Sequence, residues 1–144
     1  PASVLVHARR RHRWVRGDTP ASRHLRFLAR WPSRQAMQRA RDRIRELTDR
    51  RRLLVDVDEV VQDVNRFLRG WAAYFRYGNS ARQFDKINHY AQDRIARFVA
   101  KRHKRNRGYG LMVVVYQSPD RLGLIDLEGT TVAPRPNRPW RPGR

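Results

Sequence analysis

The sequence predicts a mainly α-helical fold: a three-helix bundle with an N-terminal β-hairpin and a short C-terminal β-hairpin or meander. Apolar residues recur at helical spacing in three segments between residues 33 and 105, and each segment follows a residue that can cap a helix. Apolar and polar residues alternate before residue 32, and β-branched residues cluster after Gly108. With 144 residues, the chain is long enough for one modest hydrophobic core.

The N-terminal hairpin is predicted from two segments, Val4–Arg16 and Arg23–Trp31, which flank the turn signal GDTP. In the second segment the apolar residues lie on one face, because they alternate with basic ones: Leu25, Phe27, Ala29 and Trp31. A two-stranded hairpin is too small to be stable alone. Its apolar face is therefore expected to pack on the rest of the chain.

The first helix is predicted to begin after Pro32, with Ser33 as its N-cap. A narrow apolar stripe follows and ends near Arg50, formed by Met37, Ala40, Ile44 and Leu47. We expect Glu46 to pair with Arg50 across one helical turn.

The second helix gives the strongest helical signal. It is predicted to begin at Asp56, which forms a capping box with Glu59. Its wide apolar face consists of Val57, Val60, Val61, Val64, Phe67, Leu68, Trp71 and Phe75. Gly78 is predicted to end the helix as a left-handed C′ residue. Gly70 lies inside the helix, where glycine costs about 1 kcal/mol relative to alanine, so we expect another backbone to approach closely there.

The third helix is predicted to start at Ser80, which has the spacing of a capping box with Gln83, and to run to about Arg105. Its apolar face consists of Phe84, Ile87, Ala91, Ile95 and Phe98. Only Asn79 separates it from the preceding helix. This tight corner is expected to bring Trp71 and Phe75 against Phe84 and Ile87.

Beyond Gly108 the runs LMVVVY and LGLIDL predict two short strands separated by turn residues. The chain thus divides into a β-hairpin at residues 1–31, a helical domain at 32–107, a short β segment at 108–133 and a Pro- and Arg-rich tail at 134–144.

The formal net charge of +20 predicts a polyanionic partner, since such charge disfavours a compact fold unless it is neutralised. Nearly all the basic residues are arginine, which suits nucleic acid. An acidic membrane surface is the alternative polyanion, but we find no transmembrane apolar run or signal peptide pattern. The chain has no cysteine, which excludes disulfides and thiolate metal sites.

Catalysis by this chain alone is not expected, and we assign no catalytic or metal-binding residue. The only dense acidic group is Asp56, Asp58 and Glu59, which fits a helix start better than a two-metal site. No serine lies in a nucleophile motif, and the glycines after Gly108 do not form a phosphate-binding loop.

The segment WPSRQAM and the longer run NRFLRGWAAYFRYGNSARQFDKINHYAQDRIARFVAKRHKR resemble the maturase-specific region of group II intron-encoded reverse transcriptases. The resemblance covers about Ser22 to Arg105, and RGWAAYFRYGNS is its most specific part. The segment QSPDRLGLIDLEG resembles the C-terminal continuation of bacterial members. The resemblance implies thumb-like helices that grip group II intron RNA, promote its folding and splicing, and support its mobility into DNA.

The chain departs from the full family because it lacks the polymerase metal-binding motif YxDD, and its five histidines and absent cysteines cannot form an HNH endonuclease. Residues 1–31 match only the end of the palm-to-thumb connection. Two alternatives to an RNA-binding maturase domain therefore stay open. One is the thumb of a reverse transcriptase whose palm lies upstream or on a separate chain, and the other is an inactive remnant.

We expect no cofactor for this chain, since Mg²⁺ would belong to the polymerase palm and to the intron RNA. The expected partner is group II intron RNA, with target DNA and a reverse transcriptase palm as further candidates and no membrane. The expected location is the bacterial cytoplasm, with association with the nucleoid as an alternative.

The candidate RNA-binding residues lie on basic stripes of the predicted helices and at the corner between the second and third. On the first helix three arginines share a flank without any acid, and on the third a basic line includes one tyrosine and adjoins Asp93, which weakens it. Such stripes position a nucleic acid backbone without reading base sequence, which favours structured RNA over duplex DNA. The candidates are Arg34, Arg41, Arg45, Arg69, Arg76, Tyr77, Asn79, Arg82, Lys86, Tyr90, Arg97, Lys101, Lys104 and Arg105.

Overall fold

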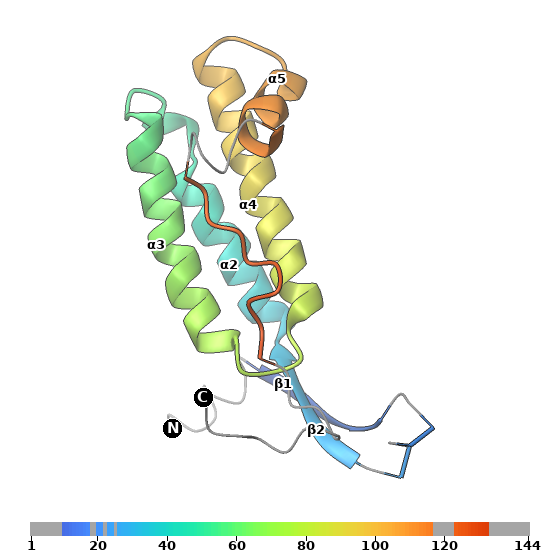
Figure 1. The fold of residues 1–144 in the computed structure, drawn as a ribbon. Helices are drawn as coiled ribbons and strands as arrows, with labels where there is room; N and C mark the ends of the chain where they lie inside the picture. The colour runs from blue at the N-terminus through green and yellow to red at the C-terminus, as the bar shows by residue number, and fades with distance from the viewer. Residues whose placement is uncertain (1–9, 18–19, 22, 25, 117–122, 133–144) are drawn as a thin grey trace, which may run out of the picture.

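The structure is a computed structural model that describes residues 10–17, 20–21, 23–24, 26–116 and 123–132. Three long helices form a bundle that stands on a two-stranded hairpin (Figure 1). The elements in chain order are β1 (Arg10–Arg16), β2 (Arg26–Pro32), α2 (Arg34–Leu47), the 3-10 turn η1 (Arg50–Arg52), α3 (Val57–Phe75), α4 (Ala81–Arg102), α5 (Arg107–Leu111) and the π-helical turn η2 (Met112–Tyr116). The predicted mainly helical fold with an N-terminal hairpin is confirmed.

The hairpin is antiparallel, with Arg10 opposite Pro32 and Arg16 opposite Arg26, and residues 4–9 of the predicted first strand lie outside the described residues. Ala29 is buried and Trp31 is partly buried, whereas Leu25 and the side chain of Phe27 lie outside the described part. The backbones of Arg30 and Asn79 fix the hairpin to the bundle, since the Asn79 amide donates to the Arg30 carbonyl at 2.7 Å. The Arg10 guanidinium also lies 4.8 Å from the centre of the Tyr74 ring.

Helix α2 begins as predicted, because the Ser33 hydroxyl accepts a hydrogen bond from the Ala36 amide at 3.1 Å. All four residues of the predicted apolar stripe are buried. The expected Glu46–Arg50 pair is wrong. The helix ends at Leu47, and Arg50 lies after it, in the 3-10 turn η1. Glu46 pairs instead with Arg43 of the same helix at 2.8 Å.

Helix α3 begins after Asp56, whose carboxylate accepts a hydrogen bond from the Val57 amide at 2.9 Å. A capping box requires a bond from the Glu59 amide instead, so the predicted capping box does not form. Its predicted apolar face points into the core, with Val57 and Phe67 at the edge of that core. The Trp71 ring packs against Phe75 at 5.1 Å and against Phe84 at 5.0 Å between ring centres. The predicted contact of aromatic residues across the corner is therefore confirmed.

Both predictions about the glycines of this region are wrong. Gly70 is exposed, and a Cβ built there would have no neighbour within 4 Å, so no backbone of the described residues approaches it. The helix ends at Phe75, and Gly78 does not have a positive φ. Glycine is required at 78 for a different reason: a Cβ there would lie 2.7 Å from the Arg30 carbonyl oxygen.

Helix α4 begins after Ser80, but the predicted capping box does not form. The Ser80 hydroxyl donates instead to the buried Phe75 carbonyl at 3.1 Å, which satisfies one of the unpaired carbonyl groups at the C-terminal end of α3. The predicted apolar face of α4 is buried throughout. The helix ends at Arg102, three residues earlier than predicted, and Lys104 has a left-handed backbone with φ of 51°.

The described residues contain no C-terminal β-hairpin, which corrects the predicted strand at Leu111–Tyr116. This segment continues the short helix α5 as η2. The Asn106 side chain caps α5 by accepting from the Tyr109 amide at 2.9 Å, and Gly110 packs so closely on Ala96 of α4 that a Cβ would overlap the Ala96 carbonyl oxygen. Packing on α4 overrides the β propensity of the valine run.

Residues 123–132 form an extended segment between α3 and α4 (Figure 1). Two buried asparagines hold it. Asn65 donates to the Gly123 carbonyl at 2.6 Å and accepts from the Ile125 amide at 3.0 Å, while Asn88 accepts from the Leu127 amide at 3.3 Å. In the described part of the predicted second strand, residues 123–127, no residue belongs to a strand. The isolated parallel bridge between Tyr77 and Val132 lies beyond that run. The predicted tail at 134–144 lies outside the described residues.

Candidate nucleic-acid interface

Helices α2 and α4 run side by side in the same direction (Figure 1). Basic residues of both helices line the same hollows. The flanks meet because each lies beside the apolar face that its helix buries in the bundle. We call this surface the α2–α4 groove and define it by Arg34, Arg41 and Arg45 of α2 with Lys86, Tyr90, Arg97 and Lys101 of α4. Seven of the predicted residues therefore line hollows along the same pair of helices.

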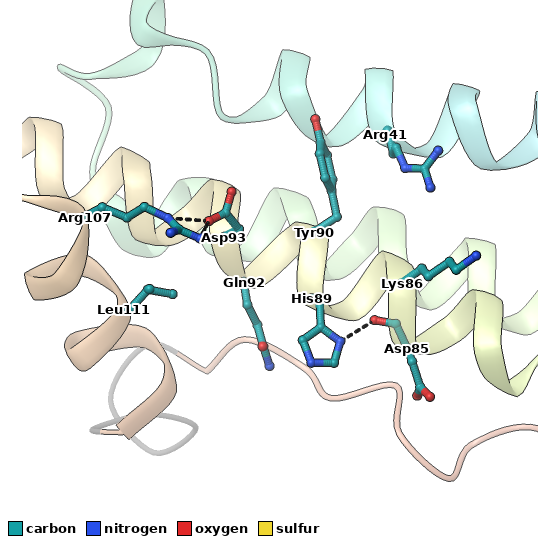
Figure 2. Close-up of a pocket in the computed structure, with 9 residues that line it drawn as sticks. All are labelled: Arg41, Asp85, Lys86, His89, Tyr90, Gln92, Asp93, Arg107 and Leu111. Atoms are coloured by element: carbon teal, nitrogen blue, oxygen red, sulfur yellow. Dashed lines mark hydrogen bonds and ion pairs between the residues drawn. The ribbon is translucent and has the colours of Figure 1, made fainter.

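The middle of the groove is a hollow of about 740 Å³ that extends from α2 across α4 to α5 (Figure 2). In Figure 2 Tyr90 stands between α2 and α4, while Arg41 and Lys86 extend along the groove from opposite sides. Tyr90 lines this hollow and is partly buried against the core. Asp85 and His89 line the outer rim, where the ring Nδ1 of His89 lies 2.7 Å from the Asp85 carbonyl.

The far end of the groove is a smaller hollow of about 240 Å³, lined by Arg45, Arg97 and Lys101. Arg94 also lines it and was missed in the sequence, although it lies on the line of Tyr90 and Arg97 at helical spacing. Its guanidinium Nε donates to the Thr48 hydroxyl at 3.0 Å. Arg94 thus ties α4 to the end of α2 and fixes the width of the groove there.

Most groove cations are not neutralised by the protein. Within the part of the chain that the structure describes, the ion pairs involve only one of them, Arg97, which lies 2.9 Å from Asp93. Asp93 also accepts from Arg107 of α5 at 2.6 Å (Figure 2). Asp93, which adjoins the basic line of α4 in the sequence, thus pairs with one cation of that line. The remaining positive charge is left for an external anion.

The other predicted residues lie outside the groove. Asn79 is a structural residue, because its amide and side chain bond the backbone of Arg30. Tyr77 is exposed as predicted, at 60%, and the Arg76 guanidinium lies 5.3 Å from its ring centre. Of the rest, Arg69 and Arg82 are exposed on α3 and α4, and Lys104 and Arg105 follow the end of α4.

Asp56 lies at the start of α3, where we predicted a helix cap and no metal site, and its side chain caps that helix. Among the described residues no three His, Asp or Glu side chains come close enough together to hold a metal ion. No helix in the described ranges has both the length and the apolar character needed to cross a membrane.

Comparison with known families agrees with the resemblance found in the sequence. The family model described as group II intron, maturase-specific domain matches residues 37–113, which is more than half of the chain. The chain belongs to this family. A reverse transcriptase palm domain is not found in it. No curated protein and no solved structure gives a match.

The matched range of the maturase-specific domain begins in the first turn of α2 and ends in η2. It includes the whole α2–α4 groove except Arg34. Membership implies group II intron RNA as the partner and splicing as the process. The hairpin and the segment 123–132 lie outside the matched range and pack on it from opposite sides of the α3–α4 turn.

Proposed function

We propose that this maturase-specific domain binds folded group II intron RNA along the α2–α4 groove and stabilises the RNA fold that supports splicing and mobility. The observation that carries the proposal is the meeting of two basic flanks, one from each helix, with five cations that no described acidic residue pairs: Arg34, Arg41, Arg45, Lys86 and Lys101. In isolation such neighbouring like charges repel each other. A polyanion bound in the groove neutralises these charges and so removes the repulsion between them.

The chemistry of the groove favours contacts to phosphate and sugar. Arginine guanidinium groups bind phosphate oxygens with two parallel N–H donors, and lysine adds a mobile point charge. These contacts fix the position of a nucleic acid without reading its bases. The single aromatic residue, Tyr90, offers a ring on which a base or ribose can pack.

The groove fits structured RNA better than duplex DNA. Its cations lie on the flanks of two packed helices, and neither helix projects from the bundle as a major-groove recognition helix does. Recognition of RNA by shape, backbone and stacking requires no such helix.

Filter binding of intron RNA across a salt series tests the proposal. If six phosphates are neutralised, the slope of log K against log salt should be about −4, from about 0.7 per contact. The triple variant Arg34→Gln/Arg41→Gln/Arg45→Gln should reduce the magnitude of this slope by about 2 and weaken binding at every salt concentration.

The matched control is Arg39→Gln/Arg43→Gln/Arg66→Gln, which removes the same charge from exposed residues of α2 and α3 away from the groove. Its slope should stay close to that of the wild-type domain. A flat response of the wild type to salt would contradict RNA binding by charge, and equal losses in both triple variants would contradict the groove as its site.

A further inference from the structure

We propose that a pocket where the hairpin meets the α2–α4 groove holds one unpaired nucleotide of the bound RNA. This rests on the proposed function and adds to it a subsite that selects for RNA structure. The pocket has a volume of about 760 Å³, which lies within the range of small-ligand sites and suits a single nucleotide. We call it the junction pocket and define it by Arg11, Trp31, Arg34, Arg41, Gln83 and Lys86.

The junction pocket is strongly cationic. Arg11 of β1 and Lys86 of α4 line it together with Arg34 and Arg41 of α2, and none of the described residues around it is acidic. These four charges converge from three separate elements. A phosphate group is a compact anion with several acceptor oxygens, and guanidinium and ammonium donors bind such an anion best.

The hairpin supplies an aromatic surface to the same pocket. Trp31 lies directly opposite Arg11 in the β1–β2 register, so both side chains are on the same face of the hairpin. That face looks toward the groove, because Arg11 and Trp31 line the pocket together. The indole is partly buried and can stack one base beside the phosphate-binding arginines.

Gln83 adds a hydrogen-bonding group with no described partner. Its side-chain oxygen is buried, yet no donor within the described residues bonds it. Because Gln83 lines the pocket, a small rotation of its side chain would turn this unpartnered acceptor toward a ligand that brings a donor. The exocyclic amino group or ring N–H of a base is such a donor.

A base within an RNA helix cannot enter this pocket, because pairing and stacking hold it inside the duplex. Only a bulged, looped or unpaired terminal nucleotide can place its base against Trp31 while its phosphate reaches the arginines. The groove therefore grips the backbone of a helix, and the junction pocket recognises the point where that helix is interrupted.

Fluorescence anisotropy with two RNA probes tests this inference: a blunt-ended RNA duplex in which every nucleotide is paired, and the same duplex with one bulged nucleotide. The wild-type domain should bind the bulged probe about tenfold more tightly, since stacking of one base contributes about 1–3 kcal/mol. Trp31→Ala should reduce the ratio of affinities to near one, and Trp31→Phe should retain most of it.

Trp14→Ala is the matched control. Trp14 is a tryptophan of the same hairpin, exposed at 66%, but it lies opposite Leu28 on the other face. Its removal should leave the tenfold preference unchanged. If Trp31→Ala fails to fold by circular dichroism, Gln83→Ala replaces it and should lower the preference at least threefold.

Three results would overturn the junction pocket: equal affinity of the wild type for both probes, equal loss of preference in Trp14→Ala and the test variants, or full preference in Gln83→Ala. Equal, salt-dependent binding of both probes would leave the proposed function intact. Absence of binding to either probe would instead remove the proposed function itself.

Discussion

Gly78 and Arg30 are in direct backbone contact: a Cβ at residue 78 would lie 2.7 Å from the Arg30 carbonyl oxygen. The same oxygen accepts a hydrogen bond from the Asn79 amide at 2.7 Å, and the Gly78 amide donates to Val132 at 3.0 Å. The α3–α4 turn is thus fixed between the hairpin and the C-terminal segment. Because the junction pocket includes a hairpin tryptophan, this contact also sets the shape of the site.

Gly78→Ala should therefore destabilise the domain by about 1–3 kcal/mol, the usual cost of overpacking a close contact. The backbone at residue 78 is accessible to alanine, so the loss would come from displacement of the hairpin. Urea denaturation measures it. Unchanged stability would show that the hairpin does not press on the turn.

Gly70→Ala should have the opposite effect, although the chemical change is the same. Gly70 lies exposed in the interior of α3 with no neighbour near its Cβ position, so alanine gains about 1 kcal/mol from helix propensity alone. The midpoint of urea denaturation should rise. A fall would indicate a contact at this face of α3 that the described residues do not show.

Asp93→Asn should tighten RNA binding by about threefold and increase the salt slope by about 0.7 for each of the two arginines, Arg97 and Arg107, that it frees for a phosphate contact. Asp63→Asn is the control. Asp63 also pairs with two arginines, Arg52 and Arg66, and has the same side-chain exposure of 24%, but it lies on α3. Filter binding should show no gain for Asp63→Asn, and an equal gain for both would place the RNA elsewhere.

Asn65→Ala and Asn88→Ala should each release the segment at residues 123–132 and lower stability by about 1–3 kcal/mol, since buried backbone groups lose their partners. Hydrogen exchange should accelerate first at the Ile125 amide for Asn65→Ala and at the Leu127 amide for Asn88→Ala. Gln62→Ala, which removes an exposed amide of α3, should change neither amide. Unaltered exchange in the asparagine variants would mean that the apolar side chains alone hold the segment.

The three long helices could be predicted because their signals are local. Apolar periodicity and N-cap residues such as Ser33 and Asp56 act within one or two turns, and they fixed the core almost residue by residue. The segment after Gly108 could not be predicted this way. Periodicity does not separate a short apolar helix from a strand, and the outcome depends on the contact of Gly110 with Ala96, which is distant in sequence.

The same distinction holds for the site. Each basic flank could be predicted from helical spacing, but the meeting of Arg41 with Lys86 depends on how α2 packs against α4. Arg11 and Trp31 were not among the candidates, because the face that a hairpin turns toward a groove is set by its docking. Ser80 and Gly78 were assigned to standard helix ends, whereas tertiary partners determine their roles.

The places where the described chain enters and leaves the bundle lie close together. Arg10 contacts the backbone and ring of Tyr74, and Val132 bonds the backbone of Arg76 two residues further on. A linker of a few residues could therefore join the two points, and new ends could be opened at the exposed turn of Arg50–Arg52. By the same geometry, the bundle can be inserted into a surface loop of a host protein without forcing that loop apart.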